Sequence, residues 1–324
     1  MRGPSGPSGR SRPVADAIRR RLLARAGLTL PTLPPRTMQV GSLTRTYVAV
    51  PGPRPDAPLL LVLHGAGGAG LGMAALTGLH TRGPAAGCAV VFPDGVQRVW
   101  NDNRGAPRLR SREGVDDVAF LVALVAEARR TGLTDATHVF ALGISNGGLM
   151  AEHVARHGLV ELDGIVLVAA SAAVRSRQAR PVPAQRARFL AFHGTADPLM
   201  PYQGGPIGGL GRLAARRSGQ PDRGSAAPIE EVAADWAFAS AGSAPLTPTA
   251  AALPGPPGDL RVECMTWAGG GGSTPTLYRV HGGGHTWPGG PSYLPARIIG
   301  PVARHLDATG IALDFVRDAV ASAH

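Results

Sequence analysis

The sequence contains no lysine, so all 33 basic side chains are arginine, against 22 acidic ones. This bias is typical of a preference for arginine codons rather than of selection for a basic surface. The two cysteines are too few for a disulfide framework. Both Cys88 and Cys264 lie in apolar, strand-like runs, and we expect two unbonded buried thiols. No run of about 18 apolar residues occurs, which excludes a membrane-spanning helix.

The net charge of +11 is concentrated at one end of the chain. Residues 1–37 carry eight arginines and one acid, whereas the rest of the chain has 25 arginines and 21 acids. This Gly/Pro/Ser/Arg-rich segment is typical of a solvated tail. No nucleic-acid-reading motif accompanies it, so we expect no nucleic-acid partner. It also lacks a convincing signal-peptide cleavage site, which makes a cytoplasmic location the default expectation.

The rest of the chain, residues 38–324, alternates short apolar runs with helical patterns. We expect strands in "PLLLVLHG", "CAVVFPDG", "THVFALGIS", "GIVLVAAS" and "RFLAFHGTAD", and a hairpin over residues 38–50. Such alternation predicts a single α/β domain with a doubly wound, mainly parallel sheet and an antiparallel N-terminal hairpin. Residues 203–228 are rich in Gly, Arg and Pro and break the rhythm, which predicts an irregular surface excursion: a flexible loop or part of a substrate-facing cap.

The strongest chemical signal is "FALGISNGGLMAEHV", in which residues 143–147 fit G-x-S-x-G between a strand and a helix. The glycines allow a sharp turn that projects the Ser145 hydroxyl at the carboxyl edge of the sheet. The following helix offers backbone N–H groups to a developing negative charge. Ser145 is therefore a candidate nucleophile.

A serine nucleophile needs a base and an acid that orients it, and in this architecture they follow in the order Ser, Asp or Glu, His. Asp197 lies where a strand meets a loop in "FHGTADPLMPY". We prefer it to Asp222, which no strand positions. His285 follows another strand in "HGGGHTWPGG" and is the candidate base. His193 and His281 end strands, which favours structural roles for both.

A glycine-rich loop opens at His64 in "LLLVLHGAGGAG". It can aim the backbone N–H of Ala66 at the same point as that of Asn146, and two such donors form an oxyanion hole. A phosphate-binding loop is the rival interpretation, but neither G-x-x-x-x-G-K-[ST] nor G-x-G-x-x-G is present.

Together, "LHGAGG", "PDG…WND", "DDVAFL", "GISNGG", "HGTADPLMPY" and "GGGHTWPGG" resemble the polyhydroxybutyrate depolymerase and feruloyl esterase group of α/β-hydrolases over about residues 38–320. The resemblance implies a serine esterase in which Ser145, Asp197 and His285 form the triad and Ala66 and Asn146 form the oxyanion hole. It further implies substrate contacts from His64, Trp100 and Trp287, although packing in the core is an equal alternative for Trp100.

The sequence departs from this group in two respects. Relatives often carry a secretion signal and additional cysteines, and this chain shows neither. Three rivals to an esterase stay open: a peptidase of the same fold, an acyltransferase with the same triad, and a non-catalytic binding protein. Asp116 and Asp117 begin a helix, which favours structural capping roles. The spacing of His, Cys and Asp predicts no metal site, no cofactor is expected, and the sequence does not define the oligomeric state.

Overall fold

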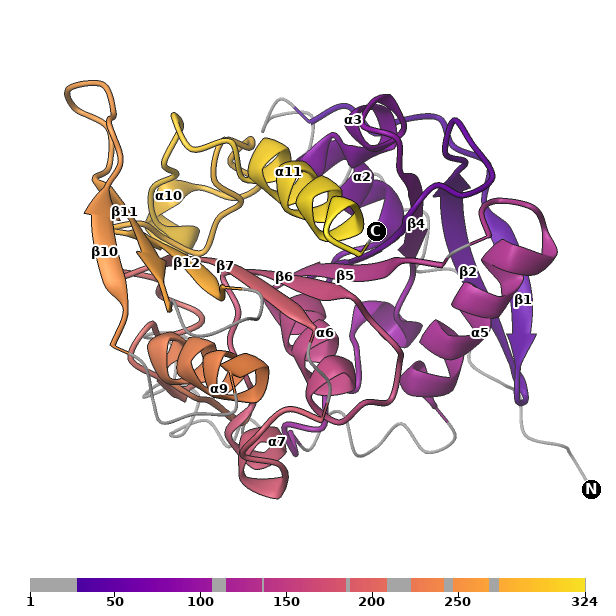
Figure 1. Cartoon of the computed structure of the whole chain (residues 1–324), viewed down its shortest axis with the longest axis horizontal. Coiled ribbons are helices and arrows are strands. Elements are labelled where there is room, and N and C mark those ends of the chain that lie inside the picture. Colours follow the sequence, from indigo (N-terminus) through magenta and orange to yellow (C-terminus); the bar gives the residue numbers. More distant parts are fainter. Residues whose placement is uncertain are drawn as a thin grey trace, which may run out of the picture.

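The computed structural model describes residues 28–106, 115–135, 137–184, 187–208, 223–241, 247–267 and 274–323. Within these ranges a 10-stranded sheet has the order β1-β2-β4-β3-β5-β6-β7-β12-β11-β10 (Figure 1). The strands are β1 Arg36–Val40, β2 Leu43–Val50, β3 Leu59–Leu63, β4 Ala89–Pro93, β5 Val139–Ile144, β6 Gly164–Val168, β7 Arg188–Gly194, β10 Thr249–Ala252, β11 Val262–Thr266 and β12 Thr276–Val280.

The centre of the sheet is parallel, from β4 through β3, β5, β6 and β7 to β12. The hairpin β1–β2 adds to β4 in antiparallel fashion, so the predicted α/β-hydrolase architecture is confirmed. The opposite edge is also antiparallel, because β11 and β10 follow β12. All four residues of β10 are exposed, so the sequence contains no pattern of buried apolar residues that would predict this strand.

Helices cover both faces of the sheet. In Figure 1, α2, α3 and α11 lie on one face, and α5, α6 and α9 lie on the other. The helices are α2 Gly70–Thr77, α3 Leu79–Ala85, α5 Asp117–Arg130, α6 Asn146–Arg156, α7 Val174–Ala179, α9 Ile229–Ala241, α10 Ala296–Ile299 and α11 Ala308–Ala321, with a short 3-10 turn at Val96–Arg98. The sequence patterns did not predict the Gly-rich α2 or the short α7.

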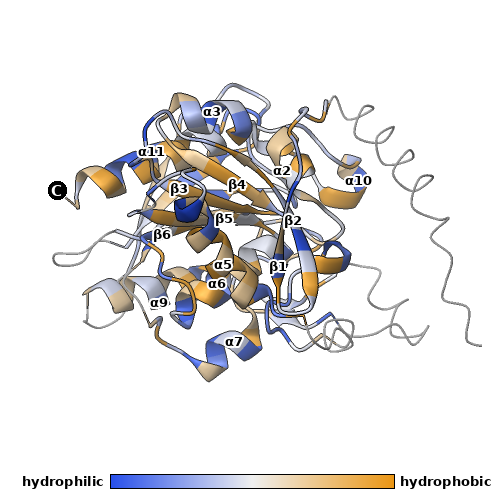
Figure 2. Cartoon of the chain, turned by 90° about the vertical axis from the view of Figure 1, so that its right-hand side faces the viewer, coloured by the Kyte–Doolittle hydropathy of each residue, from blue (hydrophilic) through white to orange (hydrophobic). Residues whose placement is uncertain are grey.

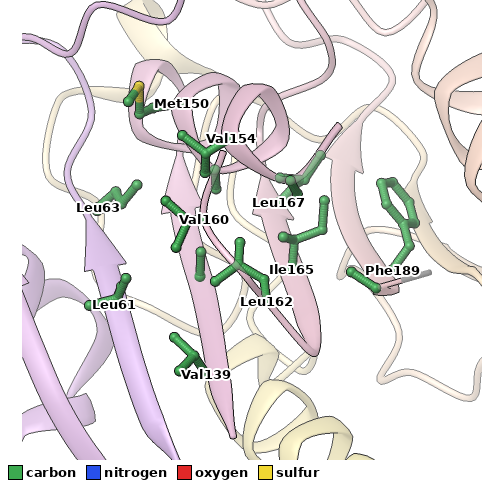
Figure 3. Close-up of a cluster of buried hydrophobic side chains, with 14 of the residues drawn as sticks. Leu61, Leu63, Val139, Met150, Val154, Val160, Leu162, Ile165, Leu167 and Phe189 are labelled. Atoms are coloured by element: carbon green, nitrogen blue, oxygen red, sulfur yellow. The ribbon is translucent and has the colours of Figure 1, made fainter. Parts of the chain in front are cut away.

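Two hydrophobic layers result from this arrangement, one on each side of the sheet. Along β3, Leu61 and Leu63 belong to the layer under α5 and α6, while Leu60 and Val62 belong to the layer under α2 and α11. Figure 3 shows the first layer between the strands and α6. Figure 2 shows the apolar strands covered by helices whose outer residues are more polar. A parallel strand buried on both faces is apolar throughout, which explains the continuous runs in the sequence.

The acidic pair at the start of α5 is structural. Asp116 caps the helix by accepting a 2.8 Å hydrogen bond from the amide of Ala119, which confirms its predicted capping role. Asp117 instead forms a buried 2.7 Å ion pair with Arg45 of β2 and accepts a hydrogen bond from the amide of Asn101. This second role was not predicted, and it ties the hairpin to the loop that follows β4.

Both cysteines are unbonded in the structure. Cys88 is buried, and burial raises the pKa of its thiol to about 11. Cys264 on β11 is only half-buried, which corrects the expectation of two buried thiols.

Candidate active site

Ser145 occupies a strained turn between β5 and α6. Its backbone has φ 55° and ψ −122°, which a non-glycine residue adopts at a cost of about 1–3 kcal/mol. Such strain is found where the surrounding structure holds a residue in a functional position. The side chain is half-buried at the carboxyl end of β5, where the following helix opens.

The glycines of the motif are required by close packing. A Cβ at Gly147 would overlap the carbonyl oxygen of Leu63 and lie 2.6 Å from that of His64. A Cβ at Gly143 would in turn meet the backbone of Gly147. Side chains at these positions would therefore push α6 away from β3 and from the loop that follows it.

Asp197 and His285 form a directly bonded pair. Asp197 follows β7, and its Oδ1 accepts hydrogen bonds from the amides of Leu199 and Met200, each 2.8 Å long. Its Oδ2 lies 2.7 Å from Nδ1 of His285. Because an ionised carboxylate only accepts, we infer that Nδ1 carries the proton and that Nε2 is free to act as a base.

The loop that carries His285 is held by backbone contacts with the segment around α10. Gly284 donates to the carbonyl of Pro301 at 3.0 Å, and His285 donates to that of Ile299 at 2.5 Å. The hydroxyl of Tyr293 donates to the carbonyl of His285 at 2.7 Å. A Cβ on Gly284 would overlap the Ile299 carbonyl, so the glycine-rich sequence lets two backbone segments cross in contact.

Ser145, Asp197 and His285 lie at the carboxyl ends of β5, β7 and β12, strands that run parallel in one sheet. They therefore share one edge, where ligands bind in open α/β sheets. Among the described residues, no hydrogen bond joins the Ser145 hydroxyl to His285. Such contacts are often long in a free enzyme and tighten when substrate binds.

Two backbone amides are available near Ser145 at this edge. Ala66 is exposed in the loop after β3, and Gly65 next to it approaches Ser145 so closely that an added Cβ would lie 3.4 Å from the serine Cβ. Asn146 is the first residue of α6, where an N–H group has no partner within the helix. Both amides therefore belong to segments next to Ser145, and their role as oxyanion donors stays a prediction.

The three predicted substrate-contacting side chains are all buried. Trp100 is 0% exposed and donates its indole N–H to the carbonyl of His64 at 2.9 Å. His64 is equally buried, and its Nε2 accepts from the amide of Gly95. Trp287 lies in the hydrophobic layer under α2 and α11, and its indole N–H donates to the hydroxyl of Thr309 at 2.9 Å. These residues therefore do not form an exposed aromatic platform. They are buried, and each polar atom named here already takes part in a hydrogen bond within the protein.

Tyr293 and Asp102 were not singled out from the sequence. Burial, reinforced by the charge of Asp197, raises the pKa of the Tyr293 phenol, which therefore stays protonated and can donate to the His285 loop. Burial raises the pKa of Asp102, whose Oδ2 accepts a 2.7 Å hydrogen bond from the side chain of Asn146. Asp102 stands in the "WND" run quoted above, but only the fold gives it this partner.

His193 is buried at the end of β7, near the Asp–His pair. Its Nδ1 lies 3.1 Å from the Gly194 carbonyl, and burial lowers the pKa of the imidazole despite the nearby charge of Asp197. The ring packs edge-on against Tyr202, with the centroids 5.5 Å apart. This neutral, packed histidine fits the structural role predicted for it.

Part of the excursion at 203–228 is an ordered ribbon, which corrects the prediction of an irregular segment. Strand β8 Gly205–Pro206 pairs with β9 Ser225–Ala226. Ile207 and Ala226 at its base pack against Leu149 of α6 and Met200 of the Asp197 loop. The ribbon thus stands beside the nucleophile helix, while residues 209–222, and with them Asp222, lie outside the described residues.

Nothing in the described ranges gathers three or more His, Cys, Asp or Glu side chains into a group that could hold a metal ion. Across the same ranges, no helix has both the length and the apolar character that crossing a bilayer requires.

Comparison with known proteins places the chain in a family. It is 32% identical over 321 residues to a Nocardia uniformis subsp. tsuyamanensis protein described as "Putative esterase NocK", a match that covers 94% of this chain and 84% of that one. No protein-family model matches the sequence.

Similar solved structures include an acetyl xylan esterase from Aspergillus awamori, which is 13% identical, with 78% of this chain and 94% of that chain covered and a TM-score of 0.48. An S-formylglutathione hydrolase from Agrobacterium tumefaciens is 19% identical, with 50% and 75% covered and a TM-score of 0.38.

The strand order and the strained serine turn define an α/β-hydrolase. Within that class, the chain belongs to the same esterase family as NocK.

Proposed function

We propose that the protein is a serine carboxylic-ester hydrolase that works through an acyl-enzyme. The observation that carries this proposal is the Asp197–His285 hydrogen bond, which leaves a basic Nε2 at the sheet edge shared with the strained Ser145. Kinship with an esterase supports the same class of reaction.

In the proposed reaction, Nε2 of His285 takes the hydroxyl proton of Ser145 as the oxygen attacks the ester carbonyl. The tetrahedral oxyanion accepts hydrogen bonds from the amides of Ala66 and Asn146. His285 then returns the proton to the departing alcohol, and an acyl-serine forms. Water repeats the sequence in the second half: His285 takes its proton, hydroxide oxygen bonds to the acyl carbon, and the acid leaves as Ser145 recovers its hydrogen.

The proposed substrates are esters of short hydroxyalkanoic acids, as in polyhydroxybutyrate, or aryl and feruloyl esters. This choice rests on the resemblance of the sequence motifs. A panel of p-nitrophenyl esters of graded chain length, methyl ferulate, acetylated xylan and polyhydroxybutyrate would rank these classes by kcat/KM.

The decisive variant is Ser145→Ala, which is expected to abolish hydrolysis of p-nitrophenyl butyrate and labelling by a fluorophosphonate. Ser171→Ala is a matched control, because this serine is also at the edge of the sheet but its hydroxyl is buried and bonded to the carbonyl of Ala227. It should keep labelling. Turnover by a folded Ser145→Ala protein would overturn the nucleophile assignment. Transfer of the acyl group to an added alcohol in preference to water would identify an acyltransferase, and an unlabelled wild type would favour a binding protein.

A further inference from the structure

Contacts to the carbonyl of Gly65 set the direction of the first proposed oxyanion donor, the N–H of Ala66. The N–H of Ala66 belongs to the same planar peptide group as the carbonyl of Gly65, and in a trans peptide the two point in opposite directions. That carbonyl accepts a 2.8 Å hydrogen bond from the amide of Gly68 and lies 2.8 Å from Nδ1 of His64. Fixing the carbonyl therefore fixes the direction of the Ala66 N–H.

His64 is itself held in place by contacts with Gly95 and Trp100. Its Nε2 accepts a 2.9 Å hydrogen bond from the amide of Gly95, so we infer that Nδ1 bears the proton and donates to Gly65. Its own carbonyl accepts the indole N–H of Trp100 at 2.9 Å. The two rings also pack together, with centroids 5.0 Å apart. Trp100 thus holds the residue that orients the first amide.

The second proposed donor is connected to the same tryptophan. The side-chain Oδ1 of Asn146 accepts from the amide of Trp100 at 2.7 Å, and its Nδ2 donates to the carbonyl of Trp100 at 3.0 Å. Nδ2 also donates to Asp102 at 2.7 Å. Asn146 is 1% exposed, so these bonds form away from water, where they constrain geometry most.

We propose that Trp100 is a positioning residue that holds the amides of Ala66 and Asn146 in register with one another. Its backbone binds the side chain of Asn146, and its indole binds the backbone of His64. The inference rests on the proposed function, because it takes these two amides as the oxyanion donors. Because Trp100 is fully buried, we assign it a role that acts through His64 and Asn146 rather than through contact with the substrate.

The loop that bears Trp100 is anchored independently of the two amides. The amide of the next residue, Asn101, donates at 2.7 Å to Asp117, whose other oxygen binds Arg45. The Trp100 loop is therefore fixed to the hairpin β1–β2 and to α5 rather than to the loops that carry Ser145 and His285. A fixed reference of this kind is what two separate loops need if their N–H groups are to converge on one oxygen.

The test compares two equally buried tryptophans. Trp100→Phe keeps an aromatic ring but removes the indole N–H. It is expected to lower kcat on p-nitrophenyl butyrate about tenfold to a hundredfold. This loss is smaller than the factor of about 10²–10³ in kcat that follows removal of a whole oxyanion donor. KM should stay near the wild-type value, because the interaction is made in the transition state. Trp236→Phe, in α9 and stacked on Phe189, should leave both constants unchanged.

Three further measurements separate positioning from general stability. Affinity for an alkyl boronic acid, which forms a tetrahedral anion on serine, should fall in Trp100→Phe in parallel with kcat. Asn146→Ala keeps its backbone amide and should show the same signature. The double variant should lose less than the product of the two single losses, because both act on one unit. Losses that multiply would overturn the coupling.

Hydrogen exchange gives a readout that needs no turnover. In Trp100→Phe, amides of residues 59–70 and 139–150 should exchange faster than in the wild type, and in Trp236→Phe they should not. A wild type inactive on every ester would refute the proposed function, and the exchange data alone would then decide the positioning role. An active wild type whose Trp100→Phe variant keeps its kcat and its exchange pattern would refute the positioning role alone.

Discussion

Replacing Asp197 by asparagine tests the triad through the tautomer of His285. Two backbone amides, from Leu199 and Met200, donate to Oδ1 of Asp197. In Asp197→Asn the side-chain oxygen must take that position, since an NH₂ group there would face two donors. The NH₂ then lies where Oδ2 does now, 2.7 Å from Nδ1 of His285. Nδ1 becomes an acceptor, and the ring proton moves to Nε2.

A histidine with its proton on Nε2 has no lone pair to offer the Ser145 hydroxyl. A change of this kind leaves the site intact but lowers kcat by about 10⁴. That factor corresponds to about 5 kcal/mol of transition-state stabilisation. KM should change little, because the substrate does not contact Asp197 in the proposed reaction.

The assay is steady-state hydrolysis of p-nitrophenyl butyrate, with Asp259→Asn as the control. Asp259 also binds a histidine, with its Oδ2 2.8 Å from Nδ1 of His305, and it likewise accepts from backbone amides. It lies in the β10–β11 loop at the same end of the sheet, but two strands beyond β12, and its partner is His305 rather than His285, so its substitution should leave kcat unchanged. An Asp197→Asn variant within about tenfold of the wild-type kcat would falsify the tautomer argument.

Three other outcomes are expected. Asp117→Ala leaves the Arg45 charge buried and should cost about 3–5 kcal/mol of unfolding free energy in urea, whereas Arg45→Met with Asp117→Leu should recover most of it; an additive double loss contradicts this. Gly147→Ala should destabilise the fold by about 1–3 kcal/mol and reduce fluorophosphonate labelling, because its Cβ meets backbone oxygens at Leu63 and His64. Hydrogen bonds from His281 and Arg279 lower the pKa of Glu263 from 4.5 to about 2, so its stabilisation is present above pH 4.5 and is lost as the pH falls towards 2. In Glu263→Gln the urea midpoint of unfolding should depend less on pH between 4.5 and 2. An unchanged pH dependence would contradict the pairing of Glu263 with His281 and Arg279.

The sequence predicts best where the structure depends on neighbouring residues. The strand, sharp turn and helix around Ser145 lie within one continuous run, and so does each apolar central strand. The sheet's carboxyl edge then follows from parallel topology, which brings Asp197 and His285 to the same side. These are the parts of the fold and candidate site that pattern alone could place.

The other features of the fold and the site depend on contacts between residues that are far apart in the chain. Trp100 and Trp287 looked available to a substrate, but their indoles bind atoms 36 and 22 residues away in the chain. The buried partner of Asp117 is 72 residues distant. Strand β10 consists of exposed residues and exists through backbone pairing with β11. No local pattern encodes such contacts.

The His285 loop depends on residues that follow it in the chain. Trp287 binds Thr309 at the start of α11, and the hydroxyl of Thr309 donates to the carbonyl of Thr77 at the end of α2. Gly289 donates to the carbonyl of Ala303. Because domains fold as their segments leave the ribosome, Ser145 and Asp197 emerge long before α11 can dock. The proposed triad therefore takes its final geometry only after α11 has been synthesised and its Thr309 has bound Trp287 and Thr77.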